Sequence, residues 1–112
     1  MIDIKSENEL SHISEAGKIV RQVLEELKYG ARPGVTTADL GKKAEEIIKK
    51  NNARSAFQGY RGFPGIICTS LNEQVIHGIP GNTRLSSGDI LSIDVGIEKN
   101  GYYADSAITI PI

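Results

Sequence analysis

Two aspartates near the end of the chain have the residue type and the spacing that can bind a metal ion. Asp94 and Asp105 lie in two runs rich in β-branched and aromatic residues, joined by the turn Glu98-Lys-Asn-Gly101, and this pattern is typical of a β-hairpin. Two carboxylates held close together on apolar strands repel each other and are costly to desolvate. A hard divalent cation with oxygen ligands relieves both costs, so the pair predicts a metal site. On spacing alone, two solvated residues on the polar face of an edge hairpin explain the pattern equally well.

The hairpin has two possible registers, and they place the two aspartates differently. If Asn100-Gly101 is the central turn pair, Asp94 lies opposite Ala107. If Lys99-Asn100 is the central pair and the glycine takes the left-handed bulge position that follows a type I turn, Asp94 lies directly opposite Asp105. The second register is favoured because glycine adopts a positive φ at the least cost. It predicts that the two Cβ atoms are about 4.5–5.5 Å apart.

Two helical patterns precede the strands that carry the aspartates. The first begins at a capping box, Ser6-Glu-Asn-Glu9, and predicts a helix from about Glu7 to Tyr29 that ends at Gly30. We expect His12, inside this helix, to be a surface residue. The apolar residues that recur at helical intervals and predict its buried face are Leu10, Ile13, Ala16, Val20, Val23, Leu24 and Leu27.

The second helix follows almost at once. Thr36-Thr-Ala-Asp39 is another capping box, with Val35 and Leu40 spaced as a hydrophobic staple, and Asn51-Asn52 ends the pattern. The charged residues of this segment are expected to form a solvated face. The residues of the buried face are Leu40, Ala44, Ile47 and Ile48.

Short strands and glycine-rich connections follow the helices. The predicted strands are 55–58, 66–70 and 74–77, and then the two strands of the final hairpin. Two helices followed by strands predict the α+β class, with both helices packed on one face of a mainly antiparallel sheet.

The composition limits the classes of function. The chain has 112 residues, enough for one small domain, and a formal net charge of −1 without a long basic run, which disfavours nucleic acid and membrane as partners. Its single cysteine, Cys68, excludes an intrachain disulfide and fits a reducing compartment. Because the N-terminus lacks the apolar segment of a signal peptide, we expect a cytoplasmic protein.

Four other side chains are candidates for a site. His77 ends a predicted strand before a Gly-Ile-Pro turn, where its imidazole could bind substrate, transfer protons or contact a metal; a hydrogen-bonded loop histidine is the simpler alternative. Tyr60 and Phe63 lie among glycines and could form the wall of an apolar pocket or fill the core. Cys68, in an apolar strand, is expected to be a small buried residue and not a nucleophile.

Several motifs, in order along the chain, resemble type I methionine aminopeptidases. The similarity runs over the whole chain, and linked motifs in a fixed order are far more specific than any single one. The segments that carry it are Gly59-Tyr-Arg-Gly-Phe-Pro64, 68–80 (Cys-Thr-Ser-Leu-Asn-Glu-Gln-Val-Ile-His-Gly-Ile-Pro), 88–95 (Gly-Asp-Ile-Leu-Ser-Ile-Asp-Val) and Gly101-Tyr-Tyr-Ala-Asp105.

The resemblance implies a fold and a site. The fold is half of a pita-bread domain, in which two pseudo-symmetric halves surround two divalent metal ions (Co, Mn, Fe or Zn). Asp94 and Asp105 match the two aspartate ligands, with Asp105 bridging both ions, and His77 matches a histidine that contacts substrate and assists proton transfer. The residues that match the pocket for the methionine side chain are Tyr60, Phe63 and Cys68.

The resemblance also implies a substrate, and a part of the site that these residues do not supply. Such enzymes remove the initiator methionine from nascent proteins at the ribosome when the next residue is small. Residues 1–112 match the N-terminal half only, and the second half of the family's domain supplies a histidine and two glutamates. We therefore expect weak metal binding and little activity from this chain alone.

Three alternatives stand beside this interpretation. The half-fold could form a homodimer through its exposed edge, which would present Asp94 and Asp105 twice around one cavity. The chain could be a non-catalytic binding module, although such a module does not need two aspartates and a histidine. Within the enzymes, the alternative is a proline-directed relative of the aminopeptidase P or prolidase type.

Overall fold

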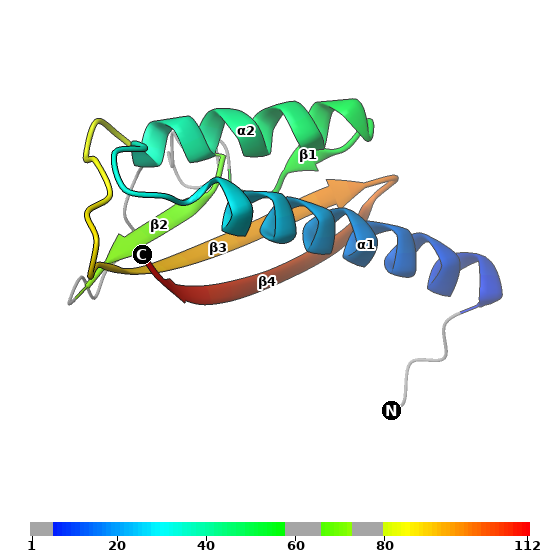
Figure 1. Cartoon of the computed structure of the whole chain (residues 1–112). Coiled ribbons are helices and arrows are strands. Elements are labelled where there is room, and N and C mark those ends of the chain that lie inside the picture. The colour runs from blue at the N-terminus through cyan, green and yellow to red at the C-terminus, as the bar shows by residue number, and fades with distance from the viewer. Residues whose placement is uncertain (1–5, 58–65, 73–79) are drawn as a thin grey trace.

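The computed structural model describes residues 6–57, 66–72 and 80–112. Two helices precede the strands, as the sequence predicts, and the predicted strand 74–77 lies outside the described residues. The strand predicted at 55–58 is observed at 54–55, and the strand predicted at 66–70 is observed at 68–71. The elements are α1 (Glu7–Gly30), α2 (Thr37–Lys50), β1 (Arg54–Ser55), β2 (Cys68–Leu71), β3 (Ile90–Lys99) and β4 (Tyr102–Pro111) (Figure 1).

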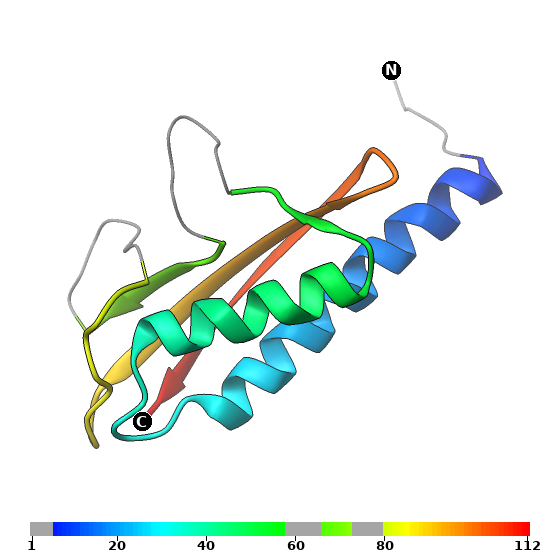
Figure 2. The same cartoon turned by 90° about the horizontal axis from the view of Figure 1, so that it is seen from above.

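The described strands form one antiparallel sheet, with β3 at its centre. β3 pairs with β1 and β2 along one side and with β4 along its whole length on the other. Both helices lie on the same side of this sheet, with α1 over β3 and β4 and α2 beside it (Figures 1 and 2). The α+β class with helices on one face of an antiparallel sheet is therefore confirmed.

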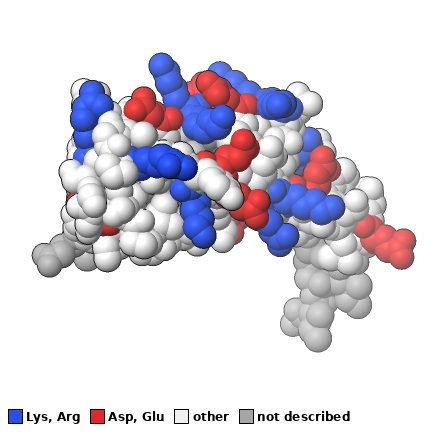
Figure 3. Space-filling view, in the orientation of Figure 1, with Lys and Arg blue, Asp and Glu red and all other residues white. Residues whose placement is uncertain are grey.

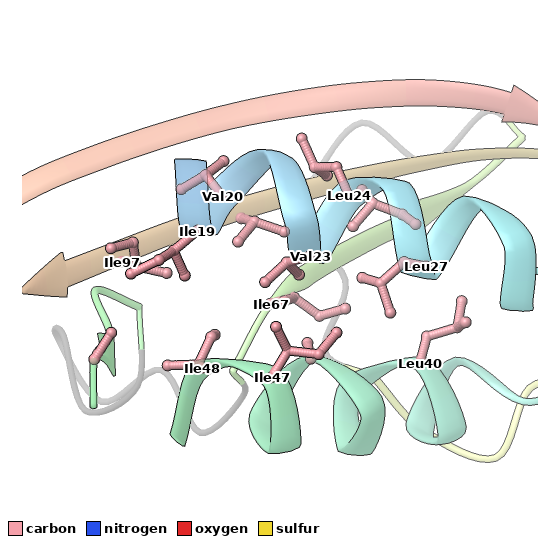
Figure 4. Packing of buried hydrophobic residues seen from close by; sticks show 14 of the residues in the cluster. Ile19, Val20, Val23, Leu24, Leu27, Leu40, Ile47, Ile48, Ile67 and Ile97 are labelled. Atoms are coloured by element: carbon pink, nitrogen blue, oxygen red, sulfur yellow. The ribbon is translucent and has the colours of Figure 1, made fainter. Parts of the chain in front are cut away.

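The core lies between the helices and β3. Every second residue of β3 is fully buried on the helix side, as expected of a strand with one covered face. The buried faces of α1 and α2 converge on the same layer (Figure 4). Leu10 is an exception to the predicted stripe, because it is 53% exposed in the first turn of α1. The buried residues of β3 are Leu91, Ile93, Val95 and Ile97.

Both helices begin at the capping boxes that the sequence predicts. In α2 the Thr36 hydroxyl accepts a hydrogen bond from the Asp39 backbone N–H at 3.1 Å, and an Asp39 carboxylate oxygen accepts one from the Thr36 N–H at 3.0 Å. These two bonds satisfy N–H groups that have no partner within the helix. The bond from the Thr36 N–H to the Asp39 carboxylate is the largest cause of a lowered pKa of Asp39, and the Thr36 side chain lowers this pKa further.

The lowered pKa of Asp39 predicts a dependence of stability on pH. A carboxyl group with a lower pKa in the folded state stabilises the fold above its unfolded pKa, and this contribution is lost as the pH falls through the folded pKa. We expect Asp39→Asn to lower the free energy of unfolding at neutral pH and to have a smaller effect in acid. Urea unfolding at several pH values measures this, with Glu46→Gln, an exposed acid on the same helix, as the control. An effect of Asp39→Asn that is equal at all pH values would contradict the prediction.

The register of the hairpin differs from the favoured prediction. Asp94 lies opposite Ala107, and Asp105 lies opposite Gly96. The turn residues are Asn100 (φ 53°) and Gly101 (φ 82°), and positive φ at both central positions is typical of a tight two-residue turn. The prediction that the aspartates oppose each other is wrong. Asparagine also tolerates the left-handed conformation, so Asn100 and Gly101 together form the turn. The ladder therefore continues one pair closer to the tip.

The helical side of the molecule carries charges of both signs. Figure 3 shows Lys and Arg interspersed with Asp and Glu on the face that it draws, so no large patch of one sign appears there. This agrees with the solvated face expected for α2. None of the described helices is long and apolar enough to cross a membrane.

Candidate metal centre

The two predicted ligands share the face of the sheet that the described helices do not cover. Asp94 alternates along β3 with the buried core residues, so its side chain lies on the side away from α1. Asp105 is across the ladder on the same side, because it pairs with Gly96, two residues further along β3. The two aspartates are therefore diagonal neighbours, for which a separation of about 7–8 Å is usual, with Cβ atoms somewhat closer. Asp94 is half-buried and Asp105 is exposed.

An open hollow of about 400 Å³ lies at this pair of carboxylates. It is lined by Phe57, both aspartates and the neighbouring strand residues Val95, Ser106 and Ala107. Two acids at one hollow, one of them half-buried, are a donor set suited to a hard divalent cation. The register change leaves the metal prediction physically reasonable, because a diagonal pair still directs both carboxylates to one side of the sheet.

Glycine at position 96 shapes this hollow. A Cβ atom added there would lie 3.2 Å from the Phe57 ring and 3.3 Å from the Ala56 Cβ. Because Gly96 has no side chain, the Phe57 ring can lie against the β3 backbone at the position that pairs with Asp105. Sequence reasoning missed Phe57, although an aromatic residue just before a glycine-rich segment is a signal that could have indicated it.

Cys68 lies directly opposite Asp94 on the other neighbouring strand, β2. Its side chain is on the same side of the sheet, and the residue is only 6% exposed. Burial raises the pKa of the Cys68 thiol, and the negative charge of Asp94 raises it further. The thiol is therefore neutral near neutral pH, which agrees with the predicted small buried residue.

We expect Cys68 to react slowly with iodoacetamide in the folded chain. The thiolate is the reactive form, and the raised pKa lowers the fraction of thiolate. Burial also restricts access of the reagent to the thiol. The rate should rise only at a more alkaline pH than for a free thiol. The same single cysteine in urea is the control, and mass spectrometry measures the modified fraction. Equal rates with and without urea would show that the thiol is accessible and contradict the prediction.

The structure brings together only part of the predicted site. Asp94, Asp105 and Cys68 are neighbours on one face of the sheet, whereas His77, Tyr60 and Phe63 lie outside the described residues. Within residues 6–57, 66–72 and 80–112, no group of three or more His, Cys, Asp or Glu side chains could hold a metal ion. The two carboxylates thus fit as part of a metal site, and the described residues do not complete it.

Comparison with known proteins identifies the family of this site. The model of metallopeptidase family M24 matches residues 11–112, and the chain therefore belongs to that family. A methionine aminopeptidase of Clostridium acetobutylicum is 54% identical over the whole chain, which covers 45% of that relative. The chain thus spans less than half the length of this curated relative.

Solved structures agree with this assignment. The methionine aminopeptidase of Thermotoga maritima superposes with a TM-score of 0.94 at 39% identity over the whole chain, and the match covers 45% of that structure. An X-Pro aminopeptidase of the same organism has a TM-score of 0.77 at 23% identity, over 97% of this chain and 29% of that one. The second likeness shows the fold alone. The predicted pita-bread fold and the predicted family are both confirmed.

Proposed function

We propose that this chain supplies one half of the catalytic site of a methionine aminopeptidase, which removes the initiator methionine when the next residue is small. The observation that carries the proposal is the pair Asp94 and Asp105, two carboxylates at one hollow on the open face of an M24 sheet. The substrates are the N-termini of nascent proteins at the ribosome, in the cytoplasm. In this proposal a second half completes the site, because the chain covers only 45% of its relative.

The residues have separate tasks in this proposal. Asp94 and Asp105 would hold the divalent ions (Co, Mn, Fe or Zn), with Asp105 as a ligand of both, and the bound ions would supply Lewis-acid activation of the scissile carbonyl and of water. His77 contacts the substrate and assists proton transfer. Cys68, buried and neutral beside Asp94, contributes apolar surface to the methionine side-chain pocket. Tyr60 and Phe63 complete that pocket.

The isolated chain is expected to have little activity. Two carboxylates are fewer protein ligands than two hard or borderline divalent ions require, and residues 1–112 correspond to the N-terminal half of the full domain. Incubation of the chain with the peptide Met-Ala-Ser and Mn²⁺ or Co²⁺ tests this. Robust turnover by a monomer would contradict it.

A chimera gives the positive test of the function. This chain replaces the matching N-terminal 45% of the Clostridium acetobutylicum relative, and cleavage of Met-Ala-Ser is measured after circular dichroism confirms folding. We expect the chimera to cleave the peptide. Asp94→Asn should abolish this cleavage, whereas Glu98→Gln, which removes a carboxylate on the same strand, should leave it unchanged. A folded chimera that fails to cleave the peptide would overturn the proposal.

The main alternative within the enzymes is a proline-directed activity. The fold of an X-Pro aminopeptidase resembles this one, but the motifs of residues 59–64 and 72–80 favour the methionine enzyme. Cleavage of Met-Ala-Ser by the chimera, compared with cleavage of Arg-Pro-Ala, distinguishes the two. Preference for Arg-Pro-Ala over Met-Ala-Ser would support the alternative.

The outer edge of β4 favours a second candidate, a homodimer of the half-fold. β4 pairs only with β3 among the described strands, so the outward-pointing backbone groups of this ten-residue strand are available for pairing, and such edges readily pair with another chain. Native mass spectrometry of the chain, with and without Mn²⁺, distinguishes a dimer that carries metal from a metal-free monomer. Thr109→Lys, at an exposed position of β4 outside the hollow, is expected to prevent the pairing. A monomer in both conditions would exclude this candidate, and also a shared metal site.

A non-catalytic binding module remains the third candidate, from another class of function. The two aspartates at one hollow argue against it, because a non-catalytic module does not need them. A folded chimera that lacks both peptidase activity and metal binding would support it.

A further inference from the structure

The tip of the β3–β4 hairpin is attached to both helices. The Lys99 Nζ donates a hydrogen bond to the backbone oxygen of Asn51 at 2.5 Å and forms an ion pair with Glu15 at 3.1 Å. Asn51 is the C-cap of α2, where an ammonium group both satisfies a terminal carbonyl and interacts favourably with the helix dipole. The Lys99 side chain is only 16% exposed, so Glu15 and the Asn51 carbonyl, and not bulk water, stabilise its positive charge.

The other strand is attached at the same point. The Tyr102 ring stacks on His12 of α1, with ring centroids 5.1 Å apart and planes inclined by 13°. The side-chain amide of Asn100, in the turn, is 3.5 Å from His12 Nδ1. Lys99 and Tyr102 form the last pair of the ladder, so each strand of the hairpin is held once, directly beside the turn. We call the contacts of His12, Lys99 and Tyr102 the hairpin clasp.

The alternation of buried and exposed residues does not by itself select the register. Displacing β4 by two residues would place Asp94 opposite Asp105 and would keep every side chain on its present face, because side chains alternate with a period of two. Tyr102 would then lie opposite Ile97 instead of Lys99, about 6.6 Å further along the strand. At that distance the stack on His12 is lost. The clasp therefore opposes a displacement that the core pattern tolerates.

We propose that His12, Lys99 and Tyr102 are positioning residues that hold the hairpin in the register with Asp94 diagonal to Asp105. Together with the Asn100-Gly101 turn, the clasp thereby fixes the separation of the two carboxylates. It does so without contact with a metal or substrate. The effect of the clasp on the metal site rests on the proposed function, whereas the register of the hairpin can be measured independently of it.

The test compares the chain with a His12→Ala/Lys99→Gln variant by nuclear magnetic resonance. In the observed register, the residues flanking the two-residue turn form a hydrogen-bonded pair, so Asp94–Ala107 and Gly96–Asp105 are non-hydrogen-bonded pairs with close Hα atoms. We expect their Hα–Hα contacts to weaken in the variant and a second set, Asp94–Asp105, to appear. The affinity for Mn²⁺ is expected to change as well, because the separation of the two carboxylates changes with the register.

The controls separate a positioning effect from a loss of stability. His12→Phe with Lys99→Arg keeps a ring and a cation and is expected to restore the original contacts. His12→Ala alone is the milder variant, should the double one fail to fold. Unchanged Hα–Hα contacts in a folded variant with a lower melting temperature would overturn the inference. Absence of Mn²⁺ binding in the unaltered chain would count against the proposed metal site, and the cross-strand contacts would still decide the role of the clasp.

Discussion

An Asp94→Asn/Asp105→Asn variant is expected to lose more than about 100-fold in affinity for Mn²⁺. Loss of outer-shell partners alone costs metal sites about 10- to 100-fold, and here both carboxylates at the hollow are removed. Asparagine keeps the size of each side chain and removes its charge. Titration of the chain with Mn²⁺, followed by electron paramagnetic resonance, measures the affinity.

The matched control for this variant is Glu98→Gln. Glu98 lies on the same face of β3, four residues from Asp94, but its carboxylate is paired with Arg54. Neutralising it should leave Mn²⁺ affinity within about twofold of the unaltered chain, because the Glu98 charge is balanced by Arg54 and lies four residues from Asp94. If the double aspartate variant and the control bind Mn²⁺ equally well, the metal site lies elsewhere.

Ile93→Ala is expected to lower the free energy of unfolding by about 2–5 kcal/mol. Ile93 is completely buried at the centre of β3, in the layer between the sheet and the helices. The substitution removes buried apolar surface and leaves a cavity that strands fixed on both sides cannot close. Because small domains have a total stability of only about 5–15 kcal/mol, the loss is a large part of the whole. Urea unfolding followed by circular dichroism measures it.

Ile90→Ala is the control for the core position. Ile90 begins the same strand and is 49% exposed, so its removal should cost less than about 1 kcal/mol. Equal losses at the two positions would mean that the covered face of the sheet has been misassigned.

The helices and their ends could be predicted because the signals are local. Each capping box lies within four residues, and both boxes form the predicted hydrogen bonds. The alternation along the last two strands likewise identified the core face of β3. Leu10 fits the helical period but lies beyond the sheet that would cover it, and the length of a partner element cannot be read from the pattern of a helix.

The register could not be derived from the same patterns. Two registers that differ by two residues bury the same side chains, so the choice depended on whether glycine alone or asparagine as well takes a positive φ. The prediction that His12 is a surface residue is also wrong, because His12 is half-buried against Tyr102. Contacts between residues 12 and 102 depend on how α1 crosses the sheet, which no local signal contains.

The identity of the candidate ligands was easier to predict than their geometry. Asp94 and Asp105 were found from residue type and from family resemblance, and the structure places them on one face. Phe57 was missed because its place at the hollow depends on Gly96, thirty-nine positions later in the chain. Close approach to a glycine is a property of the assembled sheet.

The two-residue turn has a consequence for the order of folding. Asp94 and Asp105 belong to adjacent strands joined directly by Asn100-Gly101, so their approach requires closure of only a short loop. Hairpins of this kind form in about 1–10 μs, whereas contacts between distant segments pay a larger entropy of closure and form more slowly. The two carboxylates can therefore meet before α1, from the beginning of the chain, docks on the sheet. The hairpin that brings the candidate ligands together can thus form locally, and packing of α1 on the sheet then stabilises it.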